Sequence, residues 1–129
     1  MKRGILISIL VAFLTVICVL EQILVSTTLE KLNFLTNNLK DYYNESNEVL
    51  NNETLNRTQN LKEFWQKNEN LLCFFINHKD MEEVGIELNK MLSFIETNNK
   101  EEFLISLNLV IYYSKTFNHI MGLSIQNLI

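Results

Sequence analysis

Proline is absent from this chain of 129 residues, and glycine occurs only three times. Both residues interrupt regular backbone, because proline lacks the N–H donor of a hydrogen bond and glycine loses the most conformational freedom on folding. Their scarcity excludes a loop-rich or low-complexity chain and predicts long uninterrupted helices. The length suffices for one small domain rather than two.

Cysteine is also scarce, with two residues in different surroundings. Cys18 lies inside an apolar block and Cys73 in the polar remainder, so we expect no disulfide bond within the chain, and a disulfide-stabilised scaffold is excluded. The apolar neighbours of Cys73, Leu72 and Phe74, favour a buried small side chain at this position. A disulfide bond between two copies of the chain is the alternative.

Positive charge is sparse in most of the chain. Lys2 and Arg3 precede the apolar block, and all 15 acidic residues follow it. The part from Glu21 onward therefore carries nine basic and 15 acidic residues, a formal charge of −6. An acidic domain without a basic stripe is a poor partner for nucleic acids or anionic membrane surfaces, so nucleic-acid binding is excluded.

The residues of a catalytic or metal site are missing as well. A metal site needs three or four converging ligands, whereas the only two histidines are His78 and His119, far apart in the sequence. Gly4, Gly85 and Gly122 are too widely spaced for a phosphate-binding loop or a glycine-flanked nucleophile. We expect no enzymatic activity, no catalytic residue, no metal and no cofactor.

One long apolar run is present near the N-terminus. Residues 4–20 carry no charge and would span roughly 26 Å as a helix, close to the hydrocarbon thickness of about 30 Å. Glu21 and Gln22 follow, and three more apolar residues extend the run to Val25. We predict a transmembrane signal-anchor helix at residues 1–25. Because Lys2 and Arg3 flank its start, the N-terminus is predicted to be cytoplasmic and residues 26–129 extracytoplasmic.

A cleaved signal peptide is the alternative interpretation of this run. Signal peptidase prefers small residues at alternate positions; the best candidate site, Val25-Ser26-Thr27, is marginal, and no Ala-x-Ala occurs. A lipoprotein site is excluded, because the large Ile17 precedes Cys18. The apolar run is also long for a signal peptide, so we favour an uncleaved anchor in the cell membrane.

Beyond the anchor, apolar residues recur at the three- and four-residue steps of a helix face. This spacing predicts four helices, the first continuous with the anchor. Their expected buried faces are Leu29, Leu32, Leu35, Leu39 and Tyr42; Leu61, Phe64, Trp65, Leu71, Leu72 and Phe75; Met81, Val84, Leu88, Met91, Leu92 and Ile95; and Phe103, Leu104, Leu107, Val110, Ile111, Ser114 and Phe117.

Asparagine-rich segments divide these helices. We expect the first helix to end near residues 44–47 and the second near residues 77–78, with Asn77 and Asn99 as N-caps of the third and fourth. Residues 119–129 form an apolar tail that we expect to pack back on the bundle. Short links predict antiparallel neighbours, and no segment shows the alternation of a strand. The fold class is therefore all-α: a transmembrane helix continuing into an antiparallel helical bundle.

The chain resembles a family of short bacterial membrane proteins, the domain-of-unknown-function family numbered four-three-six-three. The resemblance lies in the start Lys2-Arg3-Gly4-Ile5, the runs at residues 65–67 and 75–78, two short helices after these, and the closing residues 123–129. Residues 44–60 match least. The resemblance implies a membrane anchor and a helical fold in a protein of Gram-positive bacteria, and it implies no activity or mechanism.

Two functional hypotheses follow from this pattern. The first is a non-enzymatic accessory or interaction protein at the cell envelope, anchored in the membrane and bound to a membrane or envelope protein. The second is a ligand-binding or sensory domain with a pocket between Trp65, Phe75 and the last helix. Trp65 and Phe75 are at helical spacing and fit a core better than a pocket, and His78 fits a capping or packing role at a helix junction better than a site.

Overall fold

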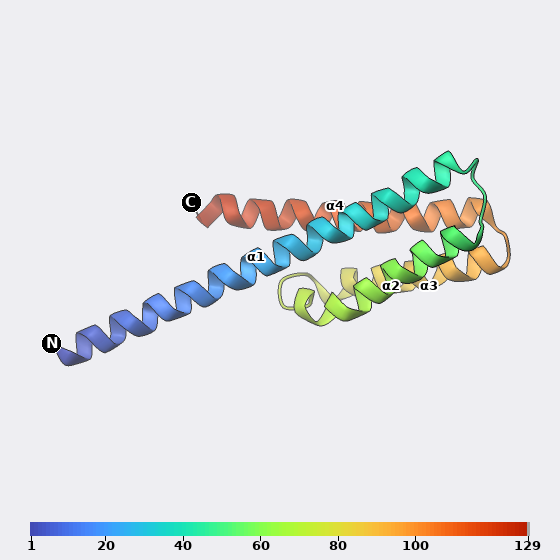
Figure 1. Cartoon of the computed structure of the whole chain (residues 1–129). Coiled ribbons are helices and arrows are strands. Elements are labelled where there is room, and N and C mark those ends of the chain that lie inside the picture. Colours follow the sequence, from blue (N-terminus) through green and yellow to red (C-terminus); the bar gives the residue numbers. More distant parts are fainter. Residues whose placement is uncertain (129) are drawn as a thin grey trace.

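The computed structural model describes the backbone of residues 1–128 and the side chains up to residue 122. These residues form four helices: α1 (Lys2–Glu45), α2 (Asn52–Leu72), α3 (His78–Glu96) and α4 (Lys100–Leu128). No strand occurs between residues 1 and 128, so the predicted all-α class is confirmed. Figure 1 shows that the N-terminal half of α1 protrudes from the other three helices.

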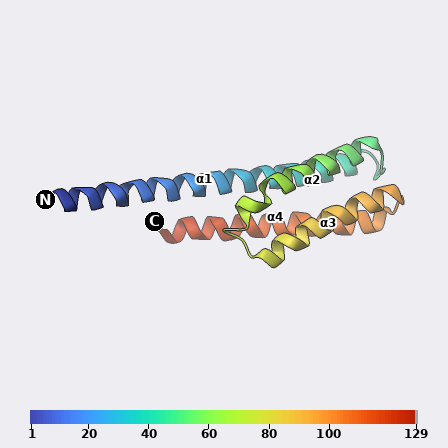
Figure 2. The ribbon, with the colours of Figure 1, turned by 90° about the horizontal axis from the view of Figure 1, so that it is seen from below.

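The helices form an antiparallel bundle in which each one packs against two neighbours: α1 on α2, α2 on α3, α3 on α4, and α4 back on α1. The connections at residues 46–51, 73–77 and 97–99 are short, which makes consecutive helices antiparallel. Two ends of the bundle result. We call the end from which α1 protrudes the proximal end; it also holds the α2–α3 connection and the C-terminal part of α4 (Figures 1 and 2). The opposite end is the distal end.

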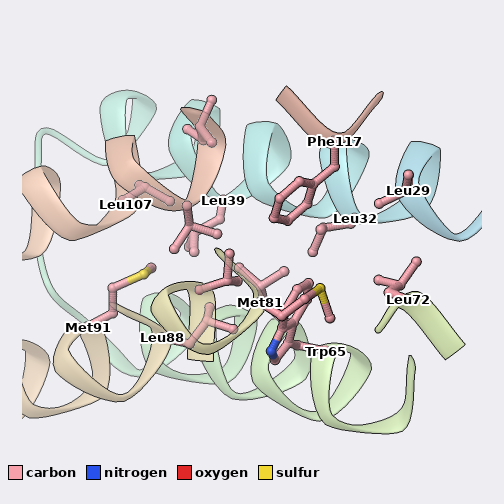
Figure 3. Packing of buried hydrophobic residues seen from close by; sticks show 14 of the residues in the cluster. Leu29, Leu32, Leu39, Trp65, Leu72, Met81, Leu88, Met91, Leu107 and Phe117 are labelled. Atoms are coloured by element: carbon pink, nitrogen blue, oxygen red, sulfur yellow. The ribbon is translucent and has the colours of Figure 1, made fainter. Parts of the chain in front are cut away.

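Buried residues recur at alternating steps of three and four along each helix, the 3.5-residue period of left-handed coiled packing. This spacing leaves one continuous seam per helix facing the centre, as Figure 3 shows for part of the core. The seams are Val25, Leu29, Leu32, Thr36, Leu39 and Tyr43 in α1; Thr54, Thr58, Leu61, Trp65 and Leu72 in α2; Met81, Val84, Leu88 and Met91 in α3; and Phe103, Leu107, Val110, Ser114, Phe117 and Met121 in α4.

Small hydroxyl residues interrupt the apolar seams without leaving unpaired polar groups. The Thr58 hydroxyl donates to the carbonyl of Thr54 at 2.8 Å, and the Thr36 hydroxyl donates to the carbonyl of Asn33 at 2.9 Å. Ser114 in α4 donates to the side-chain oxygen of Asn33 in α1 at 3.2 Å. Because these bonds satisfy the hydroxyls locally, threonine and serine fill narrow layers of the core at little desolvation cost.

Asparagine and neighbouring residues end α1 and α3 where the sequence predicted. Asn47 and Glu48 adopt positive φ angles of 57° and 58° after α1, and Asn98 adopts 52° after α3. The Asn77 side chain accepts a hydrogen bond from the backbone N–H of Lys79 at 2.9 Å, as an N-cap does. The predicted breaks near residues 44–47 and 97–99 are therefore confirmed, as is the cap at Asn77.

Three expectations about the helices were wrong in detail. On α1, Leu35 and Tyr42 are only half-buried, whereas Thr36 and Tyr43 are buried instead. Each of these pairs occupies adjacent positions, and the partner helices select the one that faces the centre. The second helix ends at Leu72 rather than near residues 77–78. Phe75, expected on the buried face of the second helix, lies in the turn after α2 and is 38% exposed. Residues 119–128 continue α4, and Met121 packs in the core as expected; residue 129 and the side chains after residue 122 lie outside the described residues.

Candidate functional site

Trp65, the first of the predicted site residues, is a core residue. Its side chain is 1% exposed and stacks on Phe117 of α4, with ring centroids 6.5 Å apart and planes inclined by 17°. Figure 3 shows the indole inside the bundle between α2 and α3, beside Met81. This placement agrees with the core interpretation that the helical spacing favoured.

The indole nitrogen of Trp65 has no hydrogen-bond partner, and it is the one buried side-chain polar atom in this situation among the described residues. Gly85 on α3 lies opposite it, and a Cβ atom added there would lie 3.7 Å from Nε1. That distance is an ordinary van der Waals contact, so the indole edge does not by itself require glycine at this position. A buried donor without an acceptor costs about 1–3 kcal/mol of unfolding free energy.

Phe75 and His78, the other two predicted residues, lie together at the proximal end and not beside Trp65 in the core. Phe75 is 38% exposed in the turn after α2, and His78 is the exposed first residue of α3. His78 Nδ1 lies 3.9 Å from the sulfur of Cys73. Among residues whose placement is described, no three His, Cys, Asp or Glu side chains gather in a way that would hold a metal ion.

Cys73 is exposed, so the prediction of a buried thiol was wrong. The residue directly follows the last turn of α2, where the neighbouring helices no longer cover the chain. Its backbone N–H still donates to the carbonyl of Glu69 at 2.9 Å, and Ile76 rather than Cys73 turns back into the core. Adjacent apolar residues in the sequence are therefore a poor guide to burial at a bundle end.

The most distinctive surface is the protruding half of α1. Its large apolar side chains from Ile5 to Leu24 are exposed except for the half-buried Ile17. An open hollow on it is lined by Leu6, Ile9, Leu10 and Phe13. Within residues 1–128 it is the one helix long and apolar enough to cross a membrane, and a signal sequence near an N-terminus would have the same properties. Full burial of each such side chain is favourable by roughly 1.5–3 kcal/mol, so water is a poor environment for this segment.

The change from exposed apolar surface to core is abrupt. Leu24 is exposed, whereas the next residue, Val25, is 0% exposed and begins the α1 seam. The helix is unbroken across this point, and the hydroxyl of Thr28 donates to the carbonyl of Leu24 at 2.8 Å. The predicted continuity between the apolar segment and the bundle is therefore confirmed, and α1 is a single helix of 44 residues.

An aromatic turn at the proximal end was not singled out from the sequence. We call residues 73–77 the proximal loop; within it, Phe74 is 85% exposed while Ile76 is buried. The sequence pattern placed Phe75 on the buried face of the second helix with Phe64 and Trp65, and this was wrong for Phe75. The signal that separates them is the N-cap Asn77, which implies a turn just before it and therefore a bundle end near Phe74.

Two polar clusters also emerge only from the packing. At the distal end, the Arg57 guanidinium lies 4.5 Å from the centre of the Tyr42 ring and bonds both Glu53 and Asn38, so it joins α2 to α1. On α3, Glu87 is 4% exposed and its carboxylate lies 2.7 Å from Lys90 Nζ. The hydrogen bond and charge of Glu87 raise the pKa of Lys90 above its usual value.

The fold and surface define a class of protein: a four-helix bundle whose first helix continues into an exposed apolar segment. Residues 19–128 match the family described as Domain of unknown function (DUF4363), and the chain belongs to this family. The match begins at Val19, so it comprises the whole bundle and only the end of the apolar segment. No curated protein and no solved structure matches the chain.

Proposed function

We propose that this protein is a membrane-anchored, non-enzymatic interaction protein at the cell envelope. The segment 1–25, which includes the N-terminal half of α1, spans the membrane, and the bundle outside it presents its surface to a membrane or envelope protein. The single observation that carries the proposal is the unbroken α1, whose large apolar side chains are mostly exposed up to Leu24 and whose inward-facing seam is buried in the core from Val25 onward. Lys2 and Arg3 at its start favour a cytoplasmic N-terminus.

The uncleaved anchor is supported by the position of Val25. This residue is the first of the best candidate cleavage site, Val25-Ser26-Thr27, and it is fully buried in the bundle. Removal of the segment before Ser26 would take Val25 out of the core and leave the seam of α1 one layer shorter. Deleting a buried aliphatic side chain of this size costs on the order of 1–3 kcal/mol. Retention of the segment is therefore favourable for the stability of the bundle.

The outer face of α4 supports a protein partner. Ile105, Leu109 and Tyr112 are exposed and follow one another at steps of four and three, opposite to the core seam of the same helix. We call these three residues the α4 stripe. Apolar residues at this spacing are what a helix presents to a second helix, and contiguous exposed apolar surface marks interaction sites. A helix of a membrane or envelope protein fits such a stripe.

The test is cross-linked purification of the full chain from native membranes. The variant Leu109→Glu places a charge in the α4 stripe, and the matched control Gln59→Glu places the same charge on the exposed face of α2. We expect one stoichiometric integral-membrane partner with the wild type and with Gln59→Glu, and its loss with Leu109→Glu. Recovery of the wild-type chain alone would contradict the interaction role.

A ligand-binding or sensory domain is the second candidate, favoured by the indole N–H of Trp65 that lacks an acceptor in the core. A small ligand with an acceptor atom would satisfy this donor if the bundle opened between Trp65, Phe75 and α4. Binding would raise the melting temperature and change the fluorescence of the chain's one tryptophan. A panel of small envelope metabolites that changes neither property would remove this candidate.

A further inference from the structure

The proximal loop carries more apolar surface than the fold uses. Ile76 alone is enough to return the chain to the core, whereas Phe74 is 85% exposed and Phe75 is 38% exposed. Phenylalanine in water forgoes roughly 1.5–3 kcal/mol that full burial would provide. The folded chain by itself therefore gives no reason for an exposed phenylalanine pair at this turn.

The two connections at the distal end differ in composition from the proximal loop. Residues 97–99 are Thr-Asn-Asn, which is polar and typical of a turn. The α1–α2 connection at residues 46–51 reads Ser-Asn-Glu-Val-Leu-Asn, with Val49 44% exposed and Leu50 half-buried. The proximal loop reads Cys-Phe-Phe-Ile-Asn and carries no charged side chain. The distal connections thus expose one aliphatic side chain between them, whereas the proximal loop exposes two aromatic side chains. Removal of this loop from water would leave no charge unsolvated.

The loop lies at the end from which the apolar segment of α1 emerges. Figures 1 and 2, seen from directions 90° apart, both place the α2–α3 connection beside the point where α1 leaves the bundle. In Figure 3, Leu72 at the end of α2 lies in the same layer as Leu29 of α1. The proximal loop follows Leu72 and so lies between that layer and the apolar segment.

Helix geometry places this loop at the depth of a membrane interface. Leu29 is nine residues beyond Leu20, the last residue of the uncharged run. Along the axis of α1, Leu29 therefore lies roughly 14 Å beyond Leu20. If the apolar residues up to Val25 also lie in the hydrocarbon, the distance from its edge to Leu29 is about 6 Å. The headgroup region extends roughly 5–8 Å beyond the hydrocarbon on each side. A side chain that points from the Leu72 layer towards the apolar segment reaches this region.

We propose that Phe74, with Phe75 beside it, inserts into the outer-leaflet interface of the bilayer that α1 spans. The inference rests on the proposed membrane anchor and extends it, because the bundle then has two membrane contacts instead of one. Aromatic and aliphatic side chains at this depth gain burial of their apolar surface. The driving force is apolar rather than ionic, because the proximal loop carries no charge and the bundle is acidic.

A second contact has a mechanical consequence. A bundle held by α1 alone is free to rotate about that helix and to tilt away from the membrane. Insertion of the proximal loop removes both freedoms and holds the bundle in one orientation above the membrane. The outer face of α4 is then presented in a constant direction to proteins in the same membrane.

The test measures the depth of position 74 in the full chain. The variant Phe74→Trp introduces an indole in the proximal loop, and the matched control Val49→Trp introduces one at an exposed site in the distal turn. Both variants and the wild type are reconstituted in phosphatidylcholine vesicles with and without brominated acyl chains. Subtraction of the wild-type spectrum removes the signal of Trp65. An alkaline carbonate wash of the same vesicles shows whether the chain remains in the membrane.

We expect the added emission of Phe74→Trp to be blue-shifted and at least twofold quenched by brominated lipid, and that of Val49→Trp to be unquenched. Equal, water-like emission from both variants in carbonate-resistant vesicles would overturn the loop insertion and leave the anchor intact. Loss of the chain from the vesicles in the carbonate wash would overturn the anchor itself, and the loop insertion with it.

Discussion

At the scale of single residues, Trp65 combines the largest buried side chain with a buried donor that has no acceptor. The ring gains burial and a stacked contact with Phe117, while the N–H loses its hydrogen bond to water. These contributions oppose one another, so removal of the donor costs less than the size of the side chain suggests. Substitution by phenylalanine keeps most of the buried ring, whereas substitution by alanine removes it, so the two should lower the unfolding free energy by different amounts.

We therefore predict that Trp65→Phe lowers the free energy of unfolding by less than about 1.5 kcal/mol, whereas Trp65→Ala lowers it by about 3–5 kcal/mol. Chemical denaturation followed by far-ultraviolet circular dichroism measures both values in the same detergent. A loss of more than 3 kcal/mol in Trp65→Phe would show that the indole N–H has an acceptor in the folded protein.

Tyr43 couples the stability of the bundle to alkaline pH. Burial, and then the negative charge of Glu48, raise the pKa of Tyr43 above its usual value of about 10, and burial and nearby carboxylates raise the pKa of Tyr113. A raised pKa means that the folded state holds the proton more tightly than the unfolded state. Stability is therefore complete below about pH 10 and falls as the pH rises above that value. The raised pKa of Lys90 acts in the same direction.

The prediction is a loss of unfolding free energy between pH 9 and pH 11 that is smaller in Tyr43→Phe than in the wild type. Some loss remains in the variant, since Tyr113 and Lys90 still titrate. Denaturation curves at the two pH values measure the difference. An identical loss in wild type and variant would show that Tyr43 ionises as easily in the folded as in the unfolded chain.

At the scale of elements, the proximal turn depends on one cap. Asn77 satisfies a free N–H at the start of α3 and ends the turn that begins after Leu72. Asn99 has the corresponding role at α4, where its side chain accepts from the N–H of Glu102 at 3.3 Å. Because the Asn77 side chain is exposed and does not pack in the core, its contribution to stability is that of the cap alone.

We predict that Asn77→Ala lowers the free energy of unfolding by about 1 kcal/mol, within the range of 0.5–2 kcal/mol for N-caps. The control is Asn70→Ala on the exposed surface of α2, where the better helix former leaves stability unchanged or slightly higher. Equal effects of the two substitutions would argue that the cap does not stabilise α3.

At the scale of the whole molecule, α1 determines how the bundle is oriented relative to the proposed membrane. The proposed anchor places the proximal end at the membrane and the distal turns farthest from it. Topology is therefore testable with thiols, since Cys18 lies inside the apolar segment and the distal turn is open to water. A membrane-impermeant reagent distinguishes the two sides of the membrane.

We predict that a chain with Cys73→Ser and Val49→Cys is labelled on intact cells, and that a chain whose remaining cysteine is Cys18 is not. Mass spectrometry of the membrane-bound chain should retain residues 1–25. Labelling only after permeabilisation would reverse the predicted orientation. A freely secreted form that begins near Ser26 would show that the apolar segment is a cleaved signal peptide.

The ends of α1 and α3 were predictable because they depend on local chemistry, whereas the end of α2 at Leu72 was predicted too late in the chain. Asparagine after α1 and α3, and Asn77 before α3, mark ends that short-range hydrogen bonds produce, and these are where the structure has them. The choice between Tyr42 and Tyr43 was not predictable, since adjacent residues on a helix differ by only about 100° in direction. The position of a neighbouring helix decides which of the two is buried.

The candidate site shows the same division. Trp65 was assigned to the core from its spacing, and the structure places it there. The exposure of Cys73 and Phe74 was missed, because a residue is buried only where a neighbouring element covers it. The helices that meet at the proximal end come from distant parts of the sequence. Only their packed arrangement shows that neighbouring helices cover α2 as far as Leu72 and leave the residues after it exposed.

The sequence by itself determined the all-α class, the long apolar start of α1, its continuation into the bundle, and the family to which the chain belongs. Each of these depends on composition, periodicity or short motifs, which are properties of consecutive residues. Only the tertiary structure decided which residues form the seams and that an aromatic turn lies beside the point where the apolar segment leaves the bundle. Those properties depend on contacts between segments far apart in the chain, and such contacts exist only once the four helices have packed.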